Sequence, residues 1–187
     1  SVPPESDARR IYDSIEEAKA PLAVAVDESG ELVGILTRLG ALRATLYQPA
    51  VDPTGGLRIA AAVGVNGDVA AKAERLLAAG VDCLVVDTAH GHQDRMLEAL
   101  VKIRALDPGV PVVAGNVVAE EGVAALHAAG ADAIKVGVGA GSICTTRVVA
   151  GVGVPQVTAI ADCAKVAKRR GVSLIADGGI KYSGDLA

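Results

Sequence analysis

The sequence is almost without aromatic side chains: its 187 residues include three tyrosines and neither phenylalanine nor tryptophan. This absence excludes the stacked aromatic platform on which single-stranded nucleic acids bind. A core must therefore be built from Val, Ala, Ile and Leu, and hydrophobic residues do make up 51% of the chain. Such a core suits the closely packed strands and helices of an α/β protein.

Other absences exclude further classes of protein. No apolar run approaches the roughly 20 residues of a membrane span, and the polar N-terminus has no signal-peptide core, so we expect no membrane partner. The net charge of −4 offers no basic stripe, so we expect no nucleic-acid partner. Cys83, Cys144 and Cys163 have neither a metal-ligand spacing nor an even number, which favours a reducing, cytoplasmic location.

Short apolar runs predict strands that are buried on both faces, as in a parallel sheet. They cover residues 57–65, 83–89, 110–118, 133–139 and 173–180. Segments with helical spacing alternate with them at 67–80, 92–106, 119–130 and 158–171. Three of these segments end in a glycine, a usual helix stop: Gly80, Gly130 and Gly171. A doubly wound sheet and a (β/α)8 barrel both satisfy this alternation.

The positions of the residues that could form a binding or catalytic site favour the barrel over the doubly wound sheet. Asp87, Asn116, Gly139 and Asp177 follow successive predicted strands, where the sites of barrel enzymes assemble. A doubly wound sheet would carry its glycine signature after the first strand. The glycines of 137–141 precede a cysteine loop rather than a helix, so they are not the dinucleotide fingerprint. We therefore predict an α/β chain that forms part of a TIM barrel.

Residues 1–46 predict a separate module. A helix at 7–19 precedes a strand, a turn and a second strand over 22–37, and a short helix covers 38–46. A unit of this size cannot bury a core alone, so we interpret it as the end of a small α/β module. Residues 47–56, rich in Pro, Gly and Asp, predict a linker to the barrel domain at 57–187.

The stretch GVGAGSICTTR at 137–147 joins a dense run of glycines to a cysteine. Glycines let the main chain approach a ligand closely. Cys144 is then either an inert buried thiol or a nucleophile at the mouth of a site, and the flanking motif favours the nucleophile. Cys83, in a predicted strand, and Cys163, in a predicted helix, are expected to be inert.

The motifs DTAHGH (87–92), AGNV (114–117), GVGAGSICTTR (137–147), AGVGVPQ (150–156) and IADGGIKYSGD (175–185) together resemble the IMP dehydrogenase/GMP reductase family. Ala140 stands where many members carry proline. Parts of residues 37–68 also resemble an actinobacterial branch related to IMP dehydrogenase, for which GMP reduction is the alternative reaction. On this resemblance, residues 1–46 are the tail of a regulatory module of cystathionine-β-synthase (CBS) type.

The resemblance implies a purine-nucleotide oxidoreductase whose catalytic residues are Cys144 and Thr146. The Cys144 thiolate attacks C2 of the purine, and Thr146 positions water or ammonia. The predicted reaction oxidises IMP to XMP with NAD through a covalent thioimidate, because residues 148–160 resemble bacterial dehydrogenases. The alternative is reduction of GMP to IMP with NADPH. Arg147 is expected to brace the loop.

The resemblance also implies binding residues. Those for the substrate nucleotide are Ser142, Asp177, Gly178 and Gly179, although an Asp-Gly pair is also a common turn. Those for the NAD cofactor are Asp87, Thr88, His90, Asn116, Gly137 and Gly139. Backbone carbonyls of Gly139, Gly141 and Cys144 are implied to bind K+ with a neighbouring subunit of a homotetramer. His90 and His92 equally fit a solvated helix start, they lack a third metal ligand, and His127 is expected to be structural.

The chain ends at Ala187, before the last barrel strand and the general base that the resemblance implies. We therefore expect an incomplete barrel that is inactive by itself. Such a chain would bind nucleotide at most, or associate with full-length subunits. Its unpaired strand edges are expected to promote association.

Overall fold

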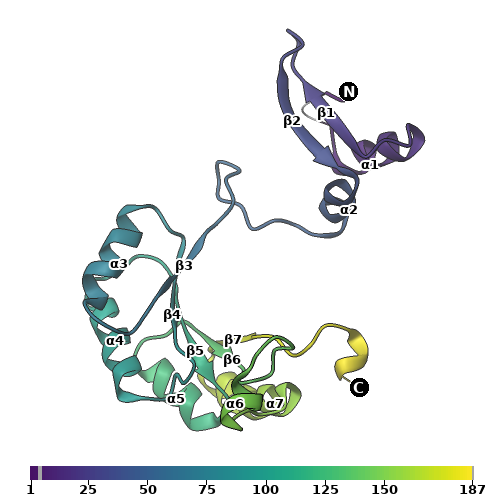
Figure 1. The fold of residues 1–187 in the computed structure, drawn as a ribbon. Helices are drawn as coiled ribbons and strands as arrows, with labels where there is room; N and C mark the ends of the chain where they lie inside the picture. The colour runs from purple at the N-terminus through teal and green to yellow at the C-terminus, as the bar shows by residue number, and fades with distance from the viewer. Residues whose placement is uncertain (4–5, 187) are drawn as a thin grey trace. The chain divides into compact units, whose positions relative to one another are not determined.

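The computed structural model describes residues 1–3 and 6–186, and the chain divides into two compact units, Ser1–Arg58 and Ile59–Ala187 (Figure 1). No helix in these described residues has both the length and the hydropathy needed to cross a membrane. The division lies close to the end of the linker predicted at 47–56. The origin of the first unit as a regulatory-module remnant stays a prediction.

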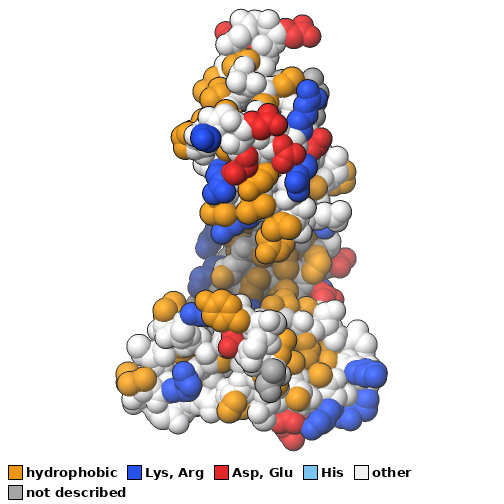
Figure 2. Space-filling model, turned by 90° about the vertical axis from the view of Figure 1, so that its right-hand side faces the viewer, with side chains coloured by type: hydrophobic (Ala, Val, Ile, Leu, Met, Phe, Trp, Pro, Cys, Tyr) orange, Lys and Arg blue, Asp and Glu red, His pale blue; other side chains and the backbone are white. Residues whose placement is uncertain are grey.

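The first unit pairs a hairpin with two helices: α1 (Ala8–Glu17), β1 (Leu22–Val26), β2 (Leu32–Thr37) and α2 (Arg38–Leu46). The strands are antiparallel, and the carboxylate of Asp27 accepts the Ser29 and Glu31 amides in the turn between them. Its buried core is small: Ile11, Ile15, Ala23 and Ala41. Leu32, Val33 and Ile35 remain exposed on β2, and Figure 2 shows hydrophobic side chains on the molecular surface.

The second unit alternates strands and helices as predicted. Its strands are β3 (Ala60–Val63), β4 (Cys83–Asp87), β5 (Val112–Val117), β6 (Ala133–Val136) and β7 (Ser173–Ala176). Its helices are α3 (Val69–Ala78), α4 (Asp94–Arg104), α5 (Glu120–Ala128), α6 (Thr146–Ala150), α7 (Gln156–Arg170) and the 3-10 turn η1 (Ser183–Leu186). The predicted strands and helices are confirmed, most with shorter bounds, whereas α7 begins two residues before the predicted 158. The short helix α6, which follows the predicted cysteine loop, has no counterpart among them.

The strands form one parallel sheet in the order β3-β4-β5-β6-β7. Figure 1 shows the helices α3, α4, α5 and α7 along one face of this sheet, and consecutive helices of this set contact each other. The expected glycine stops are confirmed, because Gly80, Gly130 and Gly171 each follow a helix with a positive φ. The carboxylate of Asp68 caps α3 by accepting the Ala71 amide.

Side chains alternate along the strands, as the period of a strand requires. On β4, Leu84 and Val86 are fully buried against the helices. Cys83, Val85 and Asp87 have the opposite parity, and Asp87 at the end of the strand is exposed. The strand therefore delivers a carboxylate to the edge where the other strands also end.

Candidate active site

A cavity of about 380 Å³ lies at the carboxyl ends of the parallel strands. Its lining comes from β4, β5 and β6, the glycine loop, α6 and the turn after β7. The lining residues are Asp87, Thr88, Ala89, Asn116, Lys135, Gly137, Val138, Gly139, Cys144, Thr146 and Asp177. The structure therefore brings the predicted Cys144 and Thr146 together with Asp177 and most of the residues predicted for the cofactor.

Other predicted site residues lie outside this lining: His90, Gly141, Ser142, Gly178 and Gly179. Gly178 nevertheless packs on the glycine loop, because a Cβ built on it would lie 3.4 Å from Cα of Gly141. A Cβ on Gly179 would lie 3.0 Å from Cβ of Ala140. Since Ser142 is exposed and follows Gly141 directly, three of the residues predicted for the substrate nucleotide, Ser142, Gly178 and Gly179, lie near one another.

His90 lies in the exposed segment that precedes α4. Its carbonyl accepts Nε2 of Gln93 at 2.6 Å, and the same amide nitrogen lies 3.2 Å from the Thr88 hydroxyl. These contacts fit the solvated helix start that the sequence left open. The described residues contain no cluster of three His, Cys, Asp or Glu side chains suited to a metal.

Cys144 is held at the cavity by the start of α6. Its Sγ lies 3.3 Å from Oγ1 of Thr146, the first residue of that helix, and its side chain is partly exposed. Hydrogen bonds from the hydroxyl and amide of Thr146, with the positive charge of Arg147, lower the pKa of this thiol. By contrast, burial raises the pKa of Cys83, and it raises that of the fully buried Cys163 to about 11.

Arg147 packs its aliphatic stem between two glycines of the loop. A Cβ on Gly139 would lie 2.7 Å from Cγ of Arg147, and a Cβ on Gly153 would lie 2.5 Å from the same atom. Gly139 also has a φ of +69°, which other residues rarely adopt. The glycines thus let the arginine cross the loop, as expected for a residue that braces it.

Asn116 links the end of β5 to the turn after β7. Its Nδ2 donates to Oδ2 of Asp177 and to the carbonyl of Gly137, both at 2.7 Å. The hydrogen bond from Asn116, followed by the neighbouring Lys135 ammonium, lowers the pKa of the Asp177 carboxyl. Asp177 is therefore ionised at neutral pH and can accept hydrogen bonds from the hydroxyls of a ligand.

Lys135, the cation of the cavity, was not predicted from the sequence. Its Nζ lies 3.2 Å from Oδ2 of Asp177 and 3.6 Å from Oδ2 of Asp87, and its side chain is only 19% exposed. The available signal was a single charged residue inside the apolar strand AIKV.

Gln156, the first residue of α7, was also missed. It is the one buried polar residue among the described residues and is 6% exposed. Its Nε2 donates to the carbonyl of Val136 at 2.8 Å and to that of Asp177 at 3.3 Å. It therefore joins the end of β6 to the turn that carries Asp177. Its place in the motif GVGVPQ was the available signal.

The hydrogen-bond acceptors of the cavity suit a ligand that carries hydroxyl donors, as a nucleotide does. The carboxylates of Asp87 and Asp177 are suited to ribose hydroxyls, and the Oδ1 of Asn116 is a buried acceptor without a partner in the described part of the chain. The family resemblance implies that three backbone carbonyls bind K+, and one of them, that of Gly141, accepts a hydrogen bond from the Cys144 amide at 3.1 Å. A carbonyl oxygen has a second lone pair, so this turn leaves an acceptor for a cation.

Comparison with known proteins agrees with this geometry. A family model described as the IMP dehydrogenase / GMP reductase domain matches residues 13–187. GMP reductase of Mycobacterium tuberculosis is 51% identical over 187 residues, which are 100% of this chain and 39% of that protein. Inosine-5′-monophosphate dehydrogenase of Aquifex aeolicus is 49% identical over 181 residues, which are 96% of this chain and 36% of that protein.

A solved structure has the same fold. A variant of GMP reductase from Trypanosoma brucei, in complex with guanosine 5′-monophosphate, has a TM-score of 0.70 and 39% sequence identity to this chain. The match covers 100% of this chain and 39% of that one, so the chain spans about two fifths of the length of this relative. With the family model matched over residues 13–187, the chain belongs to the IMP dehydrogenase/GMP reductase family.

Proposed function

We propose that this chain carries the nucleophile and the nucleotide-binding residues of a purine-nucleotide oxidoreductase. In this reaction, Cys144 forms a transient bond to C2 of the purine base. One observation carries the proposal: the sulfur of Cys144 and the carboxylate of Asp177 line the same cavity, although they come from the glycine loop and from the turn after β7. A nucleophile and a ribose-binding group thus face one ligand.

The chemistry follows from adding sulfur to an electrophilic carbon. The Cys144 thiolate adds to C2 of IMP, and the hydrogen on C2 leaves as hydride to NAD, which supplies the acceptor when bound. The resulting thioimidate is attacked at C2 by water, and the carbon–sulfur bond breaks to release XMP and the thiol. The Thr146 hydroxyl, 3.3 Å from the sulfur, is placed to position that water and to relay its proton.

Binding is assigned to the residues around the nucleophile. Asp177 takes the ribose hydroxyls, and Ser142, Gly178 and Gly179 take the 5′-phosphate. Gly178 and Gly179 have φ values of +73° and +80°, and such turns present main-chain N–H groups to an anion. The cofactor and the cation are assigned to neighbouring residues, most of them in the same cavity or glycine loop. The cofactor is bound by Asp87, Thr88, His90, Asn116, Gly137 and Gly139. K+ is bound by the backbone carbonyls of Gly139, Gly141 and Cys144.

The proposed architecture is part of a (β/α)8 barrel. Neighbouring strands are consecutive in the chain, and the helices cover one face, whereas a doubly wound sheet has helices on both. In a barrel the opposite face would become the interior. A CBS-type origin of residues 1–46, a cytoplasmic location and a homotetramer belong to the same proposal.

Two directions of reaction share the covalent step. Oxidation of IMP with NAD is the first candidate, because residues 148–160 resemble bacterial dehydrogenases. Reduction of GMP with NADPH is the second. Relatives named GMP reductase are 51% identical over 187 residues, and relatives named inosine-5′-monophosphate dehydrogenase are 51% identical over 180 residues, so identity supports both candidates alike. In the reductive direction ammonia leaves C2 after the thiolate adds, and hydride from NADPH then replaces the sulfur.

A nucleotide with a leaving group at C2 tests the covalent step. The Cys144 thiolate should displace chloride from 2-chloroinosine 5′-monophosphate, and intact-mass and peptide spectrometry should place the adduct on Cys144. Cys144→Ser should bind IMP in calorimetry and form no adduct. Binding without an adduct on Cys144, or an adduct on Cys83 or Cys163 instead, would contradict the proposal.

The absorbance of the reduced nicotinamide separates the directions. It should rise with IMP plus NAD for a dehydrogenase and fall with GMP plus NADPH for a reductase. No change in either assay with a folded chain would support a third function, namely nucleotide binding or association with longer subunits without turnover.

A further inference from the structure

We propose that Lys135 is a positioning residue that holds the carboxylates of Asp87 and Asp177 together and thereby couples the two nucleotide-binding halves of the cavity. The identity of the two ligands rests on the proposed function, in which Asp177 takes the substrate ribose and Asp87 the cofactor ribose. The coupling itself rests on the geometry of one ammonium group between two carboxylates.

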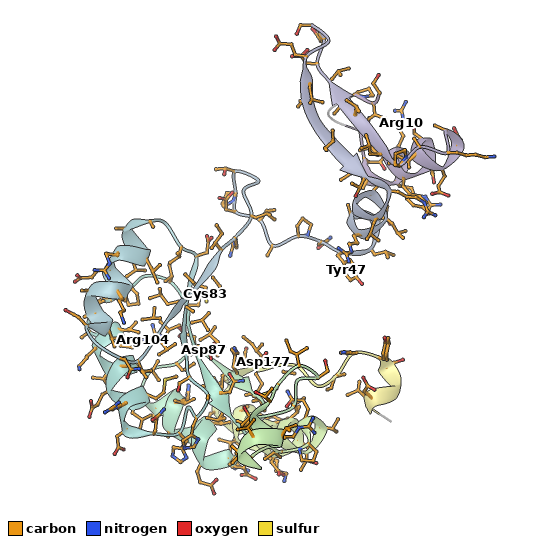
Figure 3. All side chains as sticks on the ribbon, viewed as in Figure 1. Arg10, Tyr47, Cys83, Asp87, Arg104 and Asp177 are labelled. Carbon is orange, nitrogen blue, oxygen red and sulfur yellow. The ribbon has the colours of Figure 1, made fainter. Side chains whose placement is uncertain are left out.

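The lysine reaches across the sheet. It projects from β6, and its Nζ is 3.2 Å from Asp177, which follows the neighbouring strand β7. On the other side it is 3.6 Å from Asp87, which ends β4 and lies two strands away. Figure 3 labels both carboxylates, and both line the cavity that contains Cys144.

A glycine on the strand between them makes this reach possible. Gly115 of β5 is in register with Asp87 on one side and with Lys135 on the other. A Cβ on Gly115 would lie 2.5 Å from Cβ of Lys135 and 2.7 Å from its carbonyl oxygen, closer than real Cβ atoms approach. The missing side chain therefore leaves the path along which the lysine approaches Asp87.

The charges of the cavity show why the cation matters. The titratable groups that line it are the carboxylates of Asp87 and Asp177, the Lys135 ammonium and the Cys144 thiol. Asn116 supplies a neutral donor to Asp177 alone. Without Lys135, two carboxylates would face each other across a partly enclosed site, where repulsion is less screened than at an open surface. Each would then turn away from the orientation that holds a ribose diol.

One ammonium shared by two carboxylates also links their ligands. Ribose hydroxyls that donate to Asp177 replace part of the hydrogen bonding that it takes from Lys135. The ammonium can then pair more closely with Asp87 and fix it for the second ligand. Linkage makes the effect reciprocal, and we expect each nucleotide to raise the affinity for the other by about 5-fold, the lower end of usual couplings.

The experiment compares the 187-residue chain with Lys135→Met, which removes the charge, and Lys135→Arg, which keeps it. Calorimetry, with Cys144→Ser present in every protein compared so that IMP and NAD cannot react, gives the affinities for IMP, for NAD, and for NAD with saturating IMP. We expect the Met variant to bind each ligand about 10-fold or more weakly, since unpaired partly buried charges are costly, and to lose the coupling. The Arg variant should restore both.

Carboxyl NMR provides a measurement that needs no ligand. The pKa of Asp177 should rise in Lys135→Met and return toward the wild-type value in Lys135→Arg. If the Met variant unfolds, Asp87→Asn replaces it as the probe: it leaves Lys135 to Asp177 alone, so the pKa of Asp177 should fall further and the coupling should vanish.

The possible failures are distinguishable. Wild-type affinities and wild-type coupling in a folded Lys135→Met variant would overturn the positioning role, as would an unchanged Asp177 pKa in either probe variant. If the wild-type chain binds none of the nucleotides, the proposed function fails. The carboxyl titration then still decides whether Lys135 bridges the two carboxylates.

Discussion

Burial and local hydrogen bonding distinguish the three thiols of this chain. Cys144 is partly exposed and hydrogen-bonded to Thr146, which lowers its pKa, whereas Cys163 has no exposed surface. Cys83 is half-buried in the sheet, and burial raises its pKa. The reactive form of cysteine is the thiolate, so these surroundings predict different rates of alkylation.

Iodoacetamide at neutral pH should modify Cys144 about 10-fold or more faster than Cys83 or Cys163, because only Cys144 combines access with a lowered pKa. Peptide mass spectrometry after a brief exposure measures the three rates separately. In concentrated urea the three thiols should react at similar rates, which is the control. Faster modification of Cys83 or Cys163 than of Cys144 in the native protein would be incompatible with this assignment.

The raised pKa of the buried Cys163 thiol predicts that the folded chain loses stability at alkaline pH. Burial raises its pKa from 9.0 to about 11, so between these values the unfolded chain releases a proton that the folded chain retains. Because the unfolded state then binds fewer protons, the free energy of unfolding should fall as pH rises from 9.0 to about 11. Urea unfolding at several pH values measures it.

Cys163→Ala is the matched control for this pH dependence, since it removes the titrating group but leaves the lysines and tyrosines that titrate in the same range. The variant should be less stable at neutral pH because of the cavity it creates. Its free energy of unfolding should depend less on pH above 9.0, the ordinary pKa of the thiol. Equal slopes for the two proteins would refute the prediction.

At the scale of elements, the register of β4, β5 and β6 predicts the effect of a single methyl group. Gly115→Ala places a Cβ within 2.5 Å of Cβ of Lys135, so the strand or the lysine must shift. We expect a loss of about 1–3 kcal/mol in the free energy of unfolding, the usual cost of overpacking, and weaker nucleotide binding. Chemical denaturation and calorimetry measure the two effects.

Gly64 offers a comparison within the same sheet unit. It follows β3, has no atom within 4 Å of a built Cβ and does not require a positive φ. Gly64→Ala should therefore stay within about 0.5 kcal/mol of the wild type. If Gly115→Ala proved as well tolerated as Gly64→Ala, the close approach of β5 to Lys135 could not hold.

The elements differ in how far the sequence predicts them. Buried strands such as 83–89 and 110–118 have a strong apolar signal, and the helices between them end at glycines, so both kinds were predictable. The helix α6 was not, because its five residues follow a glycine-rich loop and show no helical period. The pairing of Lys135 with Asp87 depends on the register of β4, β5 and β6, in which Gly115 lies between the two residues. No local pattern of the sequence predicts this register.

The candidate site was predictable only in part for the same reason. Cys144, Thr146 and Asp177 stand in motifs with recognisable spacing, and the structure places them around one cavity. Gln156 and Lys135 act through carbonyl and carboxylate groups of other strands, so their contacts exist only after folding. In the sequence, Lys135 shows only as a charged residue in an apolar strand, and Gln156 only as a glutamine after Val-Pro.

At the scale of the whole molecule, the open sheet has consequences for association. Within the described residues, β3 and β7 each pair with a strand on one side only. Ile175 on β7 and Ile59 before β3 are large exposed hydrophobic residues, at 42% and 61%. Unpaired edges with apolar neighbours are templates for further strand pairing.

We therefore expect the 187-residue chain to associate in a concentration-dependent way, which sedimentation velocity measures directly. Substituting lysine at exposed positions of the two edges, Ala60→Lys on β3 and Ser173→Lys on β7, should weaken association several-fold, because charged side chains block edge pairing. A lysine at the exposed Ser29, in the hairpin of the first unit, is the matched control and should leave it unchanged. Monomeric sedimentation of the wild type over the whole concentration range would mean that the edges of β3 and β7 are protected, and it would contradict this prediction.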